Sequence, residues 1–235
     1  MRVRVKFTKN GCMKFIGHLD VMRYFQKALR RAGFDVALSG GYSPHMLMSF
    51  AAPLGVGVTS DAEYFDLDLR SAGSSEEMEK KLNSTMAEGI EVLSVRQISE
   101  DKSVKCMTQV AAADYEVRFR PGKIELPPDH KEKLDSFLKQ DSVMMMKKTK
   151  KGQKEIDILP LIYSMKEEDG VFSLFLSQGS VNNLKPEMAM SAYLSYMGIE
   201  APPFSMMVHR KEIYAATGDP ECPYVSLESF GREVL

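Results

Sequence analysis

Residues 2–32 of the chain read RVRVKFTKNGCMKFIGHLDVMRYFQKALRRA and contain two different periodicities. At the start, the apolar residues Val3, Val5 and Phe7 alternate with basic ones, which predicts a β-strand with one apolar face. Apolar residues then recur every three or four positions, which predicts an amphipathic helix over residues 18–32. A strand followed by a helix in this way indicates a fold that mixes β and α structure.

The same patterns continue through the first hundred residues. Residues 64–69 alternate again and predict a second strand, after an extended segment over 34–58 that Gly and Pro residues interrupt. Ser74 or Ser75 can cap a helix over residues 76–86, and a further strand follows over 90–98. The resulting order is β-α-β-β-α-β, which is the ferredoxin-like arrangement.

The second half repeats this pattern without clear sequence identity. We expect a linker at residues 99–112, and helices at 130–139 and 185–197. The predicted strands cover residues 115–120, 143–148, 155–158, 171–176 and 204–213. The expected fold is therefore α+β, with two tandem ferredoxin-like (βαββαβ) domains at residues 1–100 and 113–217 and a C-terminal tail at 218–235.

Charge is distributed unevenly along the 235 residues, although the net charge is only −1. The first 50 residues hold nine Lys and Arg against two Asp, which leaves +7, whereas residues 51–100 hold four basic and ten acidic groups, which leaves −6. A neutral chain with a strongly basic opening segment indicates a local anionic partner.

Other classes of protein are disfavoured. No run of about 18 apolar residues is present, so no membrane association is expected, and the N-terminus lacks the apolar core of a signal peptide, which makes the cytoplasm the expected compartment. Cys12, Cys106 and Cys222 are too far apart for a disulfide framework or a local metal cluster. We therefore expect no metal site of a short-motif type.

One face of the first predicted helix is basic, and it consists of Arg23, Lys27, Arg30 and Arg31. These residues follow one another at helical spacing, opposite the apolar face. Contact with the phosphates of a nucleic acid is the functional interpretation. The alternative is a solvated helix face whose long side chains cover neighbouring strands.

A second basic set lies on the first predicted strand. In a ferredoxin-like sheet, Arg2, Arg4 and Lys6 face residues of the third strand, where Tyr64, Asp66 and Asp68 alternate with apolar residues. Cross-strand ion pairs then explain both sets without a ligand. We therefore do not place the site on this sheet face, which we expect to be open.

The loop over residues 39–49, SGGYSPHMLMS, is a second candidate site. Its predicted binding residues are Gly40, Gly41, Tyr42, Ser43, His45 and Ser49. Adjacent glycines permit close approach of the backbone to a ligand, and the tyrosine and histidine can stack on a base or donate hydrogen bonds. The alternative is a hairpin in which the glycines serve only the turn and the rings cover the edge of the core.

Three segments resemble a known family when taken together. They are FIGHLDVMRYFQKALRRAGF at 15–34, SGGYSPHMLMSFAAPLGVGV at 39–58 and EYFDLDL at 63–69, and they resemble the radical-SAM-linked protein family, a domain of unknown function. Ser43 departs from the Asn of many members. The resemblance implies association with a separate radical-SAM protein, acting on RNA. S-adenosylmethionine and an iron–sulfur cluster are then expected only in that partner, because this chain has no CxxxCxxC motif.

We expect an accessory protein, more a binding protein than an enzyme, that binds tRNA or rRNA and presents it to the radical-SAM partner. One alternative is a metal-independent endoribonuclease that uses His18 and His45 as an acid–base pair, although a histidine at a helix start is commonly structural. Another alternative is a pure protein-interaction module. Lysines 147–154 predict either a basic finger or a protected edge strand.

Overall fold

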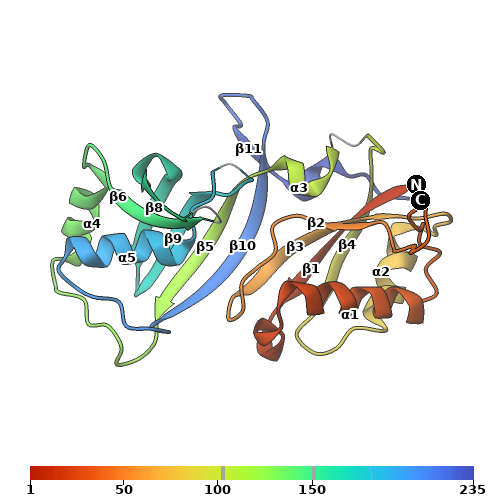
Figure 1. Cartoon of the computed structure of the whole chain (residues 1–235), viewed down its shortest axis with the longest axis horizontal. Coiled ribbons are helices and arrows are strands. Elements are labelled where there is room, and N and C mark those ends of the chain that lie inside the picture. The colour runs from red at the N-terminus through yellow and green to blue at the C-terminus, as the bar shows by residue number, and fades with distance from the viewer. Residues whose placement is uncertain (102–103, 150–151, 181) are drawn as a thin grey trace. The chain divides into compact units, whose positions relative to one another are not determined.

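The computed structural model describes residues 1–101, 104–149, 152–180 and 182–235, and the chain forms two compact units (Figure 1). The first unit comprises Met1–Ala112 and Arg210–Leu235, and the second comprises Ala113–His209. The chain therefore begins and ends in the first unit. The sequence had indicated a separate tail at 218–235, and two residues of the predicted linker, 102–103, lie outside the described residues.

The first unit has the element order that its sequence predicts. The elements are β1 (Arg2–Lys9), η1 (Gly11–Phe15), α1 (His18–Arg31), β2 (Met48–Phe50), β3 (Thr59–Asp68), α2 (Ser75–Asn83) and β4 (Val92–Ile98). Strand β1 lies between β3 and β4 and pairs antiparallel with both, and β2 pairs antiparallel with β3. Among these elements the pairing order is therefore β4-β1-β3-β2, with the two helices in the crossovers. The three-residue strand β2 lies beside the main path of the sheet, on which β3 is followed by β10 (Met206–Ala216).

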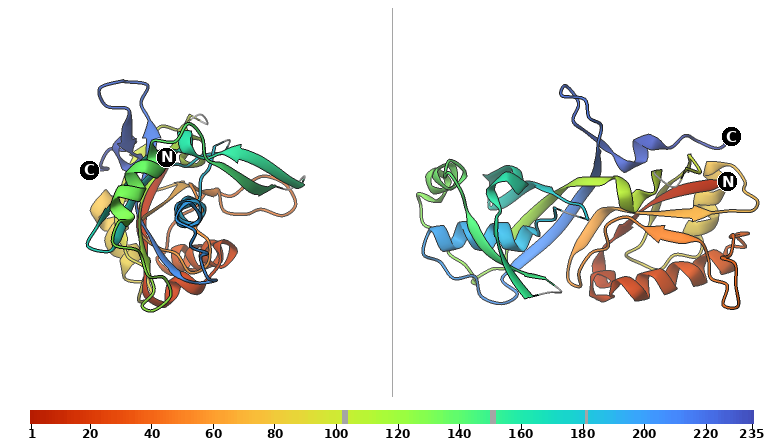
Figure 2. Two further views of the ribbon diagram at one scale, coloured as in Figure 1. Left: turned by 90° about the vertical axis from the view of Figure 1, so that its left-hand side faces the viewer. Right: turned by 45° about the horizontal axis from the view of Figure 1, so that its top comes forward.

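One face of this sheet is covered by α1 and α2 (Figure 2). The alternating residues Val3, Val5 and Phe7 face these helices and are buried. The ring of Phe25 on α1 packs against Phe7 with centroids 4.6 Å apart and against Phe65 with centroids 4.8 Å apart. Aromatic pairs at this separation add about 0.5–1.5 kcal/mol beyond their buried area, so this cluster fixes α1 on the sheet.

The ends of both helices follow from local sequence. Ser74 caps α2, because its hydroxyl accepts from the Glu77 backbone N–H while the Glu77 carboxylate accepts from the Ser74 backbone N–H. After α1, Gly33 adopts φ +71°, and the Phe34 N–H donates to the Leu29 carbonyl at 3.0 Å. This is the left-handed helix end for which glycine is favoured.

The opposite face of the sheet carries the predicted ion pairs. Arg2 lies opposite Asp68 and Arg4 opposite Asp66 in the β1–β3 register, and the two Nε–Oδ1 distances are 2.6 and 2.8 Å. The ion-pair interpretation of these residues is confirmed. The expectation of an open face is wrong, because Arg4 is only 2% exposed.

Two short segments cover this face. They are α3 (Cys106–Gln109) and η4 (Leu227–Phe230). The Arg4 guanidinium donates to the carbonyls of Val104 and Leu227, both at 2.9 Å, and the Asp66 carboxylate accepts from the Cys106 backbone N–H at 2.6 Å. The salt-bridged pair at the centre of the face thereby holds the linker and the C-terminal segment together.

The C-terminal segment is integrated into the first unit. Strand β10 (Met206–Ala216) pairs with β11 (Tyr224–Ser226), and η4 follows directly. The Lys6 ammonium lies 2.8 Å from the Glu212 carboxylate and 3.1 Å from that of Glu228. Pairing of Arg232 with Gln97 extends the contacts along β4. Residues that had no assigned place in the sequence thus complete the covered face.

The second unit contains the remaining elements. They are β5 (Val110–Phe119), α4 (His130–Leu138), β6 (Met144–Thr149), β7 (Gly152–Asp157), η3 (Leu159–Leu161), β8 (Ile162–Glu168), β9 (Val171–Ser177), α5 (Pro186–Tyr196) and the start of β10. Strand order in this unit is β10-β5-β9-β8, and β6 and β7 form a separate two-stranded sheet. Strand β8 was not predicted, because only Met165 within it is buried and its alternation is weak.

The fold class is α+β, with mostly antiparallel strands and few helices. The finer prediction of two tandem ferredoxin-like domains stays a prediction at this point. Among the described helices, none is both long and apolar enough to cross a membrane.

The thiol of Cys106 provides a test of the covered face. Burial and the charge of Asp66 raise the pKa of this thiol to about 12, and Arg4 opposes the shift. We expect iodoacetamide at pH 8 to label the exposed Cys12 and Cys222 and to spare Cys106, because its thiol is buried and its raised pKa disfavours the reactive thiolate. Peptide mass spectrometry measures this, with labelling in urea as the control. Comparable labelling of all three native thiols would show that the face is open.

Candidate functional site

The four basic residues of α1 form an exposed stripe, which we call the basic stripe: Arg23, Lys27, Arg30 and Arg31. The opposite side of α1 is buried in the core through Val21, Phe25, Ala28 and Leu29. The predicted helix and its two faces are therefore confirmed. Arg23 has a side chain 66% exposed and lies 3.4 Å from Asp20, a pair that contributes little at this exposure.

The far end of the basic stripe has one structural contact. The Arg31 guanidinium donates to the Thr85 carbonyl at 3.1 Å, just beyond the end of α2. Arg31 thus joins the two helices, whereas Lys27 and Arg30 stand exposed on the same face. The stripe can offer guanidinium and ammonium groups to an extended anion.

The other basic residues of the opening segment are used inside the fold. Arg2, Arg4 and Lys6 take part in the ion pairs of the covered face. Lys9 is 2% exposed, and its ammonium donates to the Ile16 carbonyl at 3.0 Å. Much of the +7 charge is therefore neutralised or buried, and the exposed positive charge of this segment is concentrated on α1.

A buried charged cluster near Lys9 was missed by the sequence analysis. Glu63 pairs with Arg210, whose Nε lies 3.2 Å from Glu63 Oε1 and whose Nη2 donates to the Ala52 carbonyl at 2.7 Å. Burial lowers the pKa of Lys9, an effect that Glu63 opposes and Arg210 reinforces. Glu63 and Arg210 are 147 positions apart, so no local pattern could have revealed the pair.

The loop over residues 39–45 is closed at its base and exposed at its tip. The Ser39 N–H donates to the His45 carbonyl at 2.8 Å, and the Ser39 hydroxyl lies 2.8 Å from His45 Nδ1. Gly41 has φ +96° in open space, and the Tyr42 side chain is fully exposed. The alternative in which Tyr42 covers the edge of the core is therefore contradicted, whereas its hairpin-like closure is present through Ser39 and His45.

Gly40 and Ser43 are also exposed at this tip, but Ser49 lies apart from it, in β2. The Ser49 hydroxyl is buried and has no hydrogen-bond partner among the described residues. It borders a pocket of about 130 Å³ that His45, Asp68 and Lys105 also line. The predicted loop residues thus divide into an exposed tip and a polar pocket at the base.

The two histidines of the nuclease alternative have different surroundings. The His18 ring packs edge-on against Phe50 with centroids 5.3 Å apart, whereas His45 bonds to Ser39. Within the described part of the chain, no contact joins His18 to His45. The structure therefore provides no support for an acid–base pair made of these two groups.

The pKa of His18 is lowered by burial, an effect that the charge of Glu63 opposes. A folded-state pKa below the usual value of about 6.5 means that protonation favours the unfolded state. We expect the free energy of unfolding to fall as the pH drops from about 6.5 through the lower pKa of the folded state. We expect NMR titration of the His18 ring to give a midpoint below about 6.5. A midpoint above 6.5 would contradict this placement of His18.

The lysine-rich segment is described only in part. Lys147 donates to the Asn183 carbonyl at 2.7 Å and lies opposite Lys154 in the β6–β7 register, while Lys150 and Lys151 lie outside the described residues. Within the described residues, no group of three or more His, Cys, Asp or Glu side chains is placed to hold a metal ion.

Residues 2–186 match the model of a family described as "Uncharacterized protein conserved in bacteria (DUF2344)". This match covers most of the chain, and the chain belongs to that family. It includes α1, the loop and the segments that line the pocket at Ser49. No curated protein matches the sequence.

The solved structures that are similar to this chain include two at low identity. One is the crystal structure of a Cbf5–Nop10–Gar1 complex, with a TM-score of 0.46 and 12% identity, covering 90% of this chain and 48% of that chain. The other is the archaeal box H/ACA sRNP Nop10–Cbf5 complex, with a TM-score of 0.43 and 11% identity, covering 88% and 46%. The chain spans about half the length of these matched chains.

Proposed function

We propose that this family member is a non-catalytic RNA-binding protein that presents tRNA or rRNA to a separate radical-SAM enzyme in the cytoplasm. The observation that carries the proposal is where the fold places the basic residues of the opening segment. Those on β1 are paired or buried, and those on α1 are exposed along one face. An exposed row of cations on a rigid helix is suited to the regularly spaced phosphates of a nucleic acid.

The loop tip adds a group of a second kind. The Tyr42 ring is fully exposed next to Gly41, so the fold does not use it for packing. Aromatic rings exposed to solvent can stack on unpaired bases, at about 1–3 kcal/mol for each base. We therefore assign phosphate contacts to the basic stripe and a base contact to Tyr42, with His45 fixing the loop through Ser39.

The partner and its cofactors rest on the sequence resemblance over residues 15–69. S-adenosylmethionine and the iron–sulfur cluster belong to the partner in this proposal, because the cysteines of this chain do not form the cluster motif. The chain then contributes recognition of the RNA, and the partner contributes the chemistry.

We also propose that both units are ferredoxin-like. In the first unit the order β4-β1-β3-β2 accompanies a βαββαβ sequence of elements. In the second unit the order β10-β5-β9-β8 has the same form once β6 and β7 are treated as an insertion between α4 and β8. Superposition of an experimental structure of each unit on ferredoxin-like domains tests this assignment.

Binding of tRNA and rRNA by the full chain at low salt tests the function. We expect saturable binding, competed by unlabelled RNA, and co-purification of a radical-SAM enzyme when the tagged chain is expressed in a native host. Absence of RNA binding with capture of such an enzyme would identify a pure protein-interaction module. Absence of both would overturn the proposal.

A further inference from the structure

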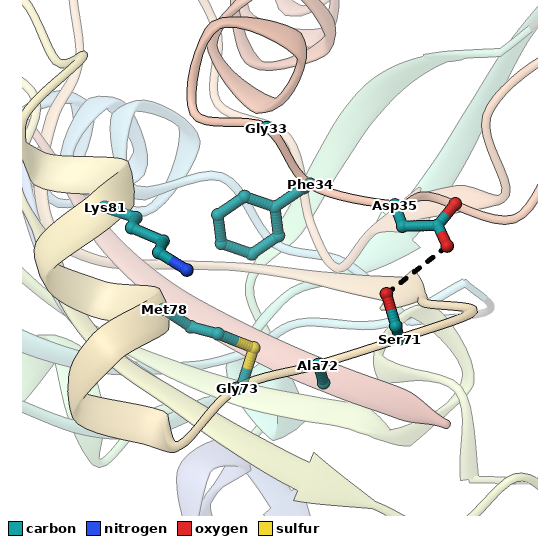
Figure 3. Close-up of a pocket in the computed structure, with 8 residues that line it drawn as sticks. All are labelled: Gly33, Phe34, Asp35, Ser71, Ala72, Gly73, Met78 and Lys81. Atoms are coloured by element: carbon teal, nitrogen blue, oxygen red, sulfur yellow. Dashed lines mark hydrogen bonds between the residues drawn. The ribbon is translucent and has the colours of Figure 1, made fainter.

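A small pocket lies where the chain leaves α1, between that segment, residues 71–73 and α2 (Figure 3). Its volume is about 140 Å³. Phe34 and Asp35 line it from one segment, Ser71 from the second, and Met78 and Lys81 from α2. Figure 3 shows the Phe34 ring between the two α2 side chains and the Asp35–Ser71 pair.

The local sequence builds this pocket. Gly33 has a left-handed backbone conformation, which ends α1 and turns the chain at Phe34. The Arg70 N–H donates to the Asp35 carbonyl at 2.8 Å. This bond brings the segment after β3 alongside the segment after α1. The Ser71 hydroxyl then donates to Asp35 Oδ2 at 3.3 Å and orients the carboxylate.

The lining combines three kinds of chemistry. Met78 is 2% exposed and Phe34 is half-buried, so they present an apolar surface. Asp35 is exposed and acts only as a hydrogen-bond acceptor when ionised. Lys81 is exposed and adds a cation. A planar ligand with hydrogen-bond donors on one edge and a negative group nearby satisfies all three, and a nucleotide has this combination.

Pocket size restricts how a base can enter. A cavity of about 150 Å³ accommodates benzene, so this pocket holds one six-membered ring. The six-membered ring of a purine carries its Watson–Crick edge. Guanine has adjacent N1–H and N2–H donors on that edge, which match the two oxygens of a carboxylate, whereas adenine and cytosine place an acceptor beside their amino group. Uracil has a single donor between two acceptors.

We propose that this pocket binds the base of an unpaired guanosine in the RNA held by the basic stripe. Asp35 accepts from guanine N1–H and N2–H, the Phe34 ring stacks on the base, and Lys81 faces a flanking phosphate. This inference rests on the proposed function and names the nucleotide that it selects. Gly33, which lines the pocket, comes directly after the end of α1 and donates its N–H to the carbonyl of Arg30 in the basic stripe. An RNA strand bound along α1 therefore leads to the pocket.

The test compares single-stranded RNA octamers that are uridine except for one central G, inosine or A, with the full chain. We expect the G octamer to bind about tenfold more tightly than the A octamer. Inosine, which lacks the N2 amino group, falls between them. In Asp35→Asn, where one acceptor becomes a donor, the preference for G is lost, because the amide matches the donor–acceptor pair of adenine and no longer the two donors of guanine.

Two further variants separate the roles of the lining. Phe34→Leu keeps an apolar residue after the helix end but removes the aromatic face, so all octamers weaken about equally, by tenfold or more. Lys27→Gln, outside the pocket, weakens G and A octamers alike and keeps the preference for G. The unfolding temperature of each variant is measured beside that of the wild-type chain, and binding is compared at a temperature at which all of them are folded.

Binding of guanosine monophosphate alone, measured by ligand-detected NMR, distinguishes this inference from the proposed function. Equal binding of all octamers by the wild-type chain would overturn the guanosine pocket and leave RNA binding in place. Binding of guanosine monophosphate that requires Asp35, without binding of any octamer, would support the pocket and overturn the RNA proposal. Absence of both would overturn both.

Discussion

Replacement of Asp66 with Asn is expected to lower the free energy of unfolding of the first unit by about 3–5 kcal/mol. The Asp66 carboxylate accepts from the Arg4 guanidinium at 2.8 and 3.2 Å and from the Cys106 N–H at 2.6 Å. Asparagine keeps the shape but leaves Arg4 as a buried charge without a counterion. Its NH2 group replaces the oxygen that accepts from the Arg4 guanidinium and the Cys106 N–H, so that donors face donors. Such a loss is far more costly than the loss of an exposed pair.

Asp68→Asn is the matched control, because Asp68 pairs with Arg2 on the same two strands but is 29% exposed. Its cost is expected to be about 1 kcal/mol or less. Hydrogen exchange of the β1 and β3 amides measures the first unit separately from the second. Equal costs for the two variants would show that the sheet face around Arg4 is hydrated, and that the C-terminal segment does not cover it.

The second large effect is expected from Arg23, Lys27 and Arg30 changed together to Gln. Glutamine keeps much of each apolar stem, so packing changes little while three cations are lost. Arg31 is left in place because it bonds to the Thr85 carbonyl. If each cation contributes about 1 kcal/mol, RNA affinity falls roughly 100-fold.

Lys123, Lys139 and Lys166 changed together to Gln provide the control. All three are exposed residues of the second unit, and the net charge changes by the same amount. We expect this control to retain affinity within about threefold, because its lysines are not aligned on one helix face. An equal loss in both triple variants would mean that net charge, and not the basic stripe, governs binding.

Periodicity predicted the first unit well. Alternation in β1 and helical spacing in α1 are local signals, and both gave the observed faces. The Arg4–Asp66 pair also followed from the expected strand order together with the alternation of charge in two strands. The local sequence pattern was sufficient to predict the buried face of an element wherever that element alone determined which of its side chains were buried.

Contacts between distant segments were not predictable. The covering of Arg4 by Leu227 joins residues 223 positions apart, and Glu63 and Arg210 are 147 positions apart. Pocket residues such as Phe34 and Ser71 carry no sequence signal of their own, since only folding brings their segments together. The candidate loop was found through its glycines and aromatic ring, whereas the exposure of Tyr42 required the structure.

RNA affinity of the wild-type chain across a salt series tests the role of the basic stripe most directly. Four phosphate contacts at about −0.7 each predict a slope of log K against log salt near −3 for single-stranded RNA. Removal of three cations from the stripe should reduce the slope to about −0.7. A slope near zero for the wild-type chain, or one that the stripe variant leaves unchanged, would contradict the assignment of α1 as the phosphate-binding surface.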